Sequence, residues 1–144
     1  LQPWLSPKAI ARQQANADAF AALQRGDGTA ALASLGDHVK FAVLPFSYLR
    51  GRAHLLTKDY ASAETDLQEA IRSSRNIANN ASITGKLPVI EMLSHFYLGQ
   101  VYEQGGKRDQ ALNEYQNFLS HFPDEKTPLP QIGEARAALK RLMQ

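Results

Sequence analysis

The chain has no cysteine among its 144 residues. This absence excludes disulfides, thiol catalysis, zinc sites with thiolate ligands and iron–sulfur clusters. It leaves the cellular compartment open, because a chain without cysteine is compatible with reducing and oxidising surroundings. We therefore expect the fold to depend on its own apolar core, for which a chain of this length is sufficient.

Long apolar stretches and runs of like charge are also missing. No segment approaches the roughly 18–20 apolar residues that cross a bilayer, so we expect no membrane insertion within this chain. The first residues, Leu1-Gln2-Pro3-Trp4, lack the pattern of a signal peptide. Sixteen basic and fourteen acidic residues leave a net charge of +2, too small a surplus to indicate a nucleic-acid partner. Because Leu1 is not a methionine, we expect an excised domain, or else a processed protein.

Groups that could carry catalysis are few and scattered. No two of the four histidines have the i, i+4 spacing of a helical metal pair; they are His38, His54, His95 and His121. Gly26-Asp27-Gly28 lacks the Lys-Ser/Thr that completes a phosphate loop. Glu64, Asp66 and Glu69 are predicted to form a solvated helix face. We therefore predict no catalytic residue, metal or cofactor, and no enzyme.

A repeated spacing stands out against these absences. Twice, a glycine is followed twelve residues later by an alanine, and a large apolar residue follows four residues after that. The two sets are Gly51, Ala63 and Leu67, and Gly99, Ala111 and Tyr115. A glycine and an alanine let two antiparallel helices approach closely, and large side chains fill the groove that remains. The spacing therefore predicts helical hairpins.

The second set extends to Leu98-Gly99-x-x-Tyr102…Ala111-x-x-x-Tyr115…Phe118…Pro123 and resembles the tetratricopeptide repeat family. The first set fits the family less completely, because Arg50 replaces the usual leucine and His54 the usual tyrosine. A degenerate copy precedes both, with the turn Arg25-Gly26-Asp27-Gly28 followed by Ala31. The resemblance implies an all-α, right-handed superhelical stack of about three hairpins with a C-terminal capping helix.

Helix periodicity and capping residues give the boundaries. Seven helices are predicted, at 7–25, 29–39, 45–57, 60–75, 87–104, 108–121 and 131–143. They form a single domain over residues 1–144. Its parts are a degenerate hairpin (1–44), a second hairpin (45–76), an inserted loop (77–86), a third hairpin (87–123) and the capping helix (129–144). Ser6 and Asp59 are predicted to cap the helices that follow them.

The resemblance also implies a binding surface, because the first helix of each hairpin lines the concave side in this family. Matching the repeats residue by residue gives eight candidate partner-binding residues: Gln13, Phe20, Tyr48, Arg52, Leu55, Phe96, Gln100 and Glu103. Only Arg52 is of the kind that grips a peptide carboxylate in some family members, so that activity is not expected. Tyr48 and Phe96 could equally pack in the core, and Trp4 could fill the groove.

These features predict a scaffold that binds a protein or peptide partner. The last third, from Tyr115 to the helix with Glu134-Ala135, is similar to C-terminal repeat regions of bacterial signalling proteins, among them serine/threonine kinases and transcriptional regulators. That similarity implies a docking module within a larger protein. The alternative is a structural or oligomerisation element that pairs two copies into a homodimer. The sequence does not predict the compartment.

Overall fold

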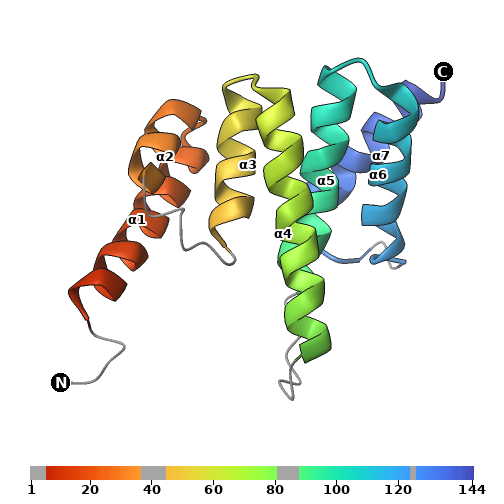
Figure 1. Cartoon of the computed structure of the whole chain (residues 1–144). Coiled ribbons are helices and arrows are strands. Elements are labelled where there is room, and N and C mark those ends of the chain that lie inside the picture. The colour runs from red at the N-terminus through yellow and green to blue at the C-terminus, as the bar shows by residue number, and fades with distance from the viewer. Residues whose placement is uncertain (1–5, 37–44, 81–87, 124–125) are drawn as a thin grey trace.

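The computed structural model describes residues 6–36, 45–80, 88–123 and 126–144. These residues form helices and contain no strand, which confirms the prediction of an all-α fold (Figure 1). The helices are α1 (Pro7–Gln24), α2 (Gly28–Leu35), α3 (Phe46–Leu56), α4 (Tyr60–Asn80), α5 (Pro88–Gln104), α6 (Arg108–Ser120) and α7 (Pro130–Leu142).

The helices pair as three antiparallel hairpins, α1–α2, α3–α4 and α5–α6, and α7 packs on α6. Neighbouring hairpins meet where α2 contacts α3 and where α4 contacts α5. The first helices α1, α3 and α5 also contact one another in turn, so they form a layer of their own. The hairpins follow one another in a row, with α1 and α2 at one end of the stack and α6 and α7 at the other (Figure 1).

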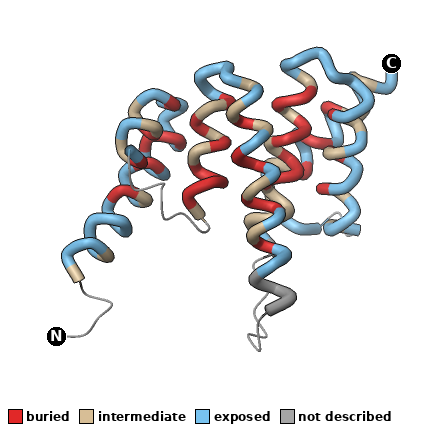
Figure 2. The backbone as a smooth tube through the Cα atoms, viewed as in Figure 1, coloured by how far each residue is buried: buried red, intermediate tan, exposed pale blue. Residues whose placement is uncertain are grey.

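One continuous core runs through the stack from Ala19 in α1 to Ala138 in α7. The buried residues lie along the sides of the helices that face one another (Figure 2). Tyr115, Phe96 and Phe118 are the largest fully buried side chains. Most of the large aromatic core therefore belongs to the third hairpin.

The repeated glycines sit beneath the large residues of the facing helix. A Cβ atom added at Gly51 would lie 2.7 Å from Cγ of Leu67, and one at Gly99 would lie 2.7 Å from Cε1 of Tyr115. The predicted close approach is therefore present, but its immediate partner is the large side chain, not the alanine. Each glycine makes room for a side chain that would otherwise hold the two helices apart.

The three hairpin turns have the same backbone geometry. Gly26, Lys58 and Gly106 have φ angles of 73°, 61° and 76°. In each turn the next N–H donates to a carbonyl five residues earlier: Asp27 to Ala22, Asp59 to His54, and Lys107 to Tyr102, at 2.9, 2.9 and 2.8 Å. This is the Schellman arrangement, in which a left-handed residue ends a helix. The degenerate first copy is thus a hairpin of the same kind as the other two.

Side-chain caps begin several of the helices. Ser6 Oγ accepts the Ala9 N–H at 3.2 Å, and Asp59 Oδ1 accepts the Ser62 N–H at 3.2 Å, which confirms both predicted caps. Asp27 Oδ1 does the same for the Ala30 N–H at 2.9 Å. The hydrogen bonds from Ser62 hold the pKa of Asp59 below its usual value.

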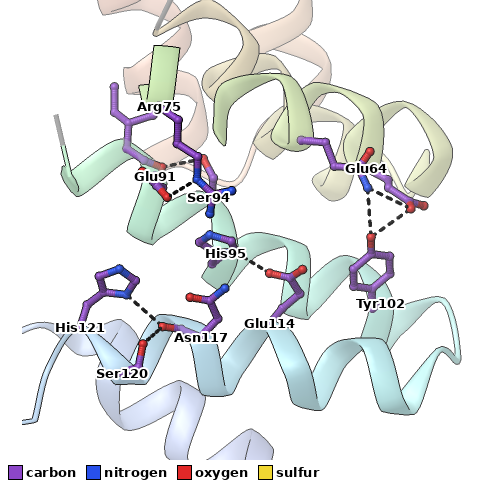
Figure 3. Close-up of polar contacts among 12 residues, drawn as sticks. Glu64, Arg75, Glu91, Ser94, His95, Tyr102, Glu114, Asn117, Ser120 and His121 are labelled. Atoms are coloured by element: carbon purple, nitrogen blue, oxygen red, sulfur yellow. Dashed lines mark hydrogen bonds and ion pairs between the residues drawn. The ribbon is translucent and has the colours of Figure 1, made fainter. Parts of the chain in front are cut away.

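Two helix ends differ from the prediction. The second helix stops at Leu35, not at residue 39, because Gly36 takes a positive φ of 43°. Helix α4 continues to Asn80, so the first four residues of the predicted 77–86 loop are helical. Before this extension, Arg75 Nε of α4 forms an ion pair with Glu91 Oε1 of α5 at 2.7 Å (Figure 3). The predictions for Trp4 and for residues 81–86 lie outside the described residues.

The prediction of a solvated acidic face on α4 is wrong for Asp66, which is 5% exposed. Arg50 donates to it from Nε at 2.7 Å and from Nη2 at 2.5 Å, and His54 Nε2 lies 3.7 Å away. Glu64 is half-buried and accepts the Tyr102 hydroxyl at 3.0 Å (Figure 3). The two departures from the repeat pattern, Arg50 and His54, therefore converge on one carboxylate.

The third hairpin has a carboxylate at the same position. Glu114 lies fifteen residues after Gly99, as Asp66 does after Gly51. Oε2 of Glu114 lies 2.6 Å from Nδ1 of the buried His95, and the two side chains form a hydrogen bond or an ion pair (Figure 3). The second and third hairpins therefore each join their two helices by a polar contact, but with different partners for the carboxylate.

Candidate partner-binding surface

Two clefts share Gln100 and Gln104, and the surface that they form, here called the first-helix face, extends from the layer of α1, α3 and α5 onto α7. Both glutamines belong to α5, the first helix of the third hairpin. One cleft reaches from α5 towards α1, and the other reaches from α5 towards α7. The clefts are therefore adjacent parts of one surface that crosses the stack.

The cleft towards α1, here called the Arg52 cleft, has a volume of about 190 Å³. Three helices and the α3–α4 turn contribute to its lining, which consists of Leu23, Arg52, Leu55, Leu56, Lys58, Tyr97, Gln100 and Gln104. The lining combines apolar side chains, two cations and two amides. It contains no carboxylate.

Arg52 is held against two aromatic rings. Its guanidinium carbon lies 4.6 Å from the Tyr97 ring centroid and 5.6 Å from that of Tyr48. The two rings meet edge to face, with their centroids 6.0 Å apart. The attraction between a cation and aromatic faces fixes the guanidinium at the cleft without neutralising its charge. Burial raises the pKa of Tyr48 to about 12, so this hydroxyl stays uncharged near neutral pH.

The cleft towards α7, here called the Glu103 cleft, has a volume of about 550 Å³. Its lining consists of Phe96, Gln100, Glu103, Gln104, Tyr115, Glu134, Ala137, Ala138 and Arg141. Glu103 lies at the centre of its polar contacts. It accepts the Tyr115 hydroxyl at 2.7 Å and the Arg141 Nε–H at 2.9 Å. Burial, together with this hydrogen bond to Glu103, raises the pKa of Tyr115 far above its usual value.

The Arg141–Glu103 pair joins α7 to α5 across the Glu103 cleft. Its partners compensate one another, and the hydrogen bond to Glu103 raises the pKa of Arg141. Glu134 adds an exposed carboxylate to the same lining. The two clefts therefore differ in charge, because the Arg52 cleft is basic and the Glu103 cleft is mildly acidic.

The structure brings most of the eight candidate residues to this surface. Arg52 and Leu55 line the Arg52 cleft, Phe96 and Glu103 line the Glu103 cleft, and Gln100 lines both. Tyr48 does not line either cleft; it is 7% exposed and lies under Arg52. Gln13 and Phe20 are exposed on α1 but belong to neither lining.

Phe96 belongs to the core more than to the cleft. It is 2% exposed, and its ring lies within 6.0 Å, centroid to centroid, of Tyr97, Tyr115 and Phe118. The packing alternative that the sequence left open therefore describes both Tyr48 and Phe96. Each supports a residue that lines a cleft, and neither offers much surface to a partner.

Several lining residues were not among the candidates. The repeat spacing contains a signal for Leu23, which stands at the same position in the first copy as Leu55 in the second. Lys58 lies in a turn and Arg141 lies in α7, so matching the first helices of the repeats could not find them. Tyr97 directly follows Phe96, and only the rotation of α5 within the stack decides which of the two faces the cleft.

No group of three or more His, Asp or Glu side chains gathers into a metal site within the ranges that the structure covers. A further cleft on the α3–α4 hairpin is lined by Arg50, His54, Ala61, Ser62, Thr65 and Asp66. Its central charges pair with one another. Of the described helices, none is both long and apolar enough to span a membrane.

The third hairpin, with its glycine beneath Tyr115 and its Schellman turn, corresponds to a known sequence family. Residues 94–125 match the tetratricopeptide repeat. This match confirms the resemblance on which the third hairpin was predicted. The first and second hairpins share the turn geometry of this tetratricopeptide repeat. No curated protein and no solved structure matches the chain.

Proposed function

We propose that the chain is a protein-interaction module that binds a peptide segment of its partner along the first-helix face. The tetratricopeptide repeat at 94–125 supports a role in protein–protein interaction or scaffolding. The observation that carries the proposal is the continuity of the Arg52 and Glu103 clefts through Gln100 and Gln104. Together they form one continuous surface, which suits docking of an extended peptide.

The central glutamine suits this role. Gln100 is half-buried, lines both clefts, and has no side-chain hydrogen bond to any described residue. Its amide offers two donors and an acceptor, which match the N–H and C=O groups of an extended peptide backbone. A hydrogen bond from a peptide stabilises the complex more when the amide is partly buried and unpaired than when it is fully solvated.

A cleft-filling substitution tests the proposal. Gln100→Trp places a large ring where the two clefts meet, and Gln116→Trp places the same ring on an exposed position of α6. Immobilised wild-type chain and the Gln116→Trp control should capture the same partners from an extract of the source cells. Gln100→Trp should lose them while keeping its helical circular dichroism. Equal capture by both tryptophan variants would overturn the proposal.

Self-association is the second candidate function. Ile10 and Phe20 of α1 are 55% and 50% exposed, which leaves apolar surface at the N-terminal end of the stack. Light scattering across a range of concentrations distinguishes the two functions. A tight dimer that is indifferent to Arg52→Ala and Gln100→Ala would favour pairing of two copies.

We further propose that the module belongs to a larger bacterial signalling protein. The similarity of the last third to C-terminal repeat regions of such proteins supports this placement. The sequence of the full-length gene tests it. A kinase or DNA-binding domain joined to this module would agree, and a gene that encodes neither would contradict it.

A further inference from the structure

Arg52 differs from the other cations of the described chain. Six of them form ion pairs with carboxylates; these are Arg50, Arg72, Arg75, Lys107, Arg108 and Arg141. Seven cations form no ion pair within the described ranges. Arg52 is the half-buried member of this set, and the other six are exposed: Lys8, Arg12, Arg25, Lys58, Arg136 and Lys140. Arg52 thus combines partial burial with a charge that no carboxylate of the described residues compensates.

The surroundings of Arg52 preserve that charge. Its contacts are the faces of Tyr48 and Tyr97, which attract a cation but carry no net charge. The Tyr48 hydroxyl is neutral near pH 7, and burial, which raises its pKa to about 12, keeps it neutral well into the alkaline range. Lys58, at the edge of the same cleft, adds a second positive charge. A half-buried cation without a counter-ion is poorly solvated, and a carboxylate that reaches it restores both hydrogen bonds and charge balance.

The apolar part of the lining limits what can bring the carboxylate there. Leu23, Leu55 and Leu56 accompany the two cations. A ligand that satisfies both parts must present an acidic group next to an apolar side chain. We propose that the partner segment carries an aspartate or glutamate side chain that pairs with Arg52, beside an apolar residue that packs on these leucines. This inference rests on the proposed peptide-binding function and specifies the partner's chemistry.

Selection from random peptides displayed on phage tests the inference directly. Displayed peptides are fused to the phage through their C-termini, so only carboxylates of Asp and Glu side chains are free to pair with Arg52. Peptides that bind the wild-type chain but not Gln100→Trp depend on the first-helix face, and they are here called the groove-dependent set. We expect this set to share an Asp or Glu next to an apolar residue, and to lose affinity as salt is raised.

Three variants then probe the charge. Arg52→Gln should weaken binding of a synthetic groove-dependent peptide by about tenfold, as loss of a charge-assisted pair does, and Lys58→Gln by a smaller factor. Arg136→Gln removes an equally unpaired cation from α7, outside both clefts, and should leave the affinity unchanged. In a repeated selection, Arg52→Glu should enrich Lys and Arg in place of Asp and Glu.

The outcomes separate the two proposals. A groove-dependent set without a shared acidic residue, or one that binds Arg52→Gln as tightly as the wild type, overturns the inference and leaves peptide binding intact. An empty selection, or peptides that bind Gln100→Trp equally well, overturns the proposed function itself.

Discussion

Arg50 of α3 and Asp66 of α4 form a two-point ion pair inside the second hairpin, with Nε to Oδ2 at 2.7 Å and Nη2 to Oδ1 at 2.5 Å. The Asp66 side chain is 7% exposed, so solvent reaches little of it and Arg50 supplies its two closest hydrogen bonds. The pattern of the family has a leucine where this chain has Arg50. The hairpin has therefore exchanged an apolar contact for a polar one.

Restoring the leucine should harm this chain. Arg50→Leu leaves the Asp66 carboxylate buried without its partner, which should lower the free energy of unfolding by about 2 kcal/mol. The further change of Asp66→Leu should recover part of that loss, because no buried charge then remains. Chemical denaturation of the single and double variants measures both effects. A double variant less stable than Arg50→Leu alone would refute this explanation.

Lys58 occupies a position that glycine takes in the other two turns. Its φ of 61° is a left-handed conformation that disfavours any residue with a Cβ atom. Lys58→Gly should therefore raise the free energy of unfolding by about 0.5–1 kcal/mol. Gly106→Lys is the reciprocal change, at a φ of 76°, and should lower it by a similar amount. Thermal unfolding midpoints that move in the same direction for both variants would contradict this account.

The fit of Tyr115 over Gly99 should make that glycine hard to replace. A Cβ at Gly99 would lie 2.7 Å from a ring atom of a fully buried tyrosine, so Gly99→Ala should lower the free energy of unfolding by about 2 kcal/mol. Gly133 in α7 provides a matched control, since a Cβ there would have no atom within 4 Å. Gly133→Ala should raise the free energy of unfolding by about 0.5–1 kcal/mol, because alanine has the higher helix propensity. Equal effects of the two changes, measured by urea unfolding, would show that the close fit is unimportant.

Alkaline conditions should weaken the fold. Burial raises the pKa of Tyr48 to about 12, and burial with the hydrogen bond to Glu64 raises that of Tyr102 to about 12, from an ordinary value of 10.0. The stability that these neutral hydroxyls contribute is intact below pH 10 and is lost between pH 10 and 12, where only the unfolded chain ionises. Each tyrosine should steepen the fall of the unfolding free energy by about 1.4 kcal/mol per pH unit in that range. Urea unfolding at a series of pH values should show that the unfolding free energy of Tyr102→Phe falls less steeply between pH 10 and 12 than that of the wild type. An equally steep fall in both proteins would contradict this role of Tyr102.

The sequence predicted the helices well because their signals are local. Apolar periodicity, Ser6 and Asp59 marked where helices lie and begin, and the glycine spacing marked the hairpins. The end of α4 was not predicted, because the polar residues Asn76, Asn79 and Asn80 are typical of loops. Burial of Asp66 was also missed, because a carboxylate on a helix gives no sign of the arginine that will cover it.

The candidate surface was predicted in part. Repeat matching found Arg52, Leu55, Gln100 and Glu103, because equivalent positions of equivalent helices face the same way. It could not decide whether Tyr48 and Phe96 face a partner or the core, because large aromatic residues serve both roles. Repeat matching could not predict that α7 lines the Glu103 cleft, since Arg141 lies beyond the last repeat.

In the proposed complex the partner lies across the first-helix face, over Gln100 and Gln104. Photocrosslinking tests this placement most directly: benzoylphenylalanine replaces Gln104, an exposed residue that lines both clefts, in one variant and the exposed Asn113 of α6 in another, and each is irradiated with the partner-containing extract. We predict a protein adduct from position 104 and none from position 113. Adducts from position 113 with none from position 104 would contradict this placement.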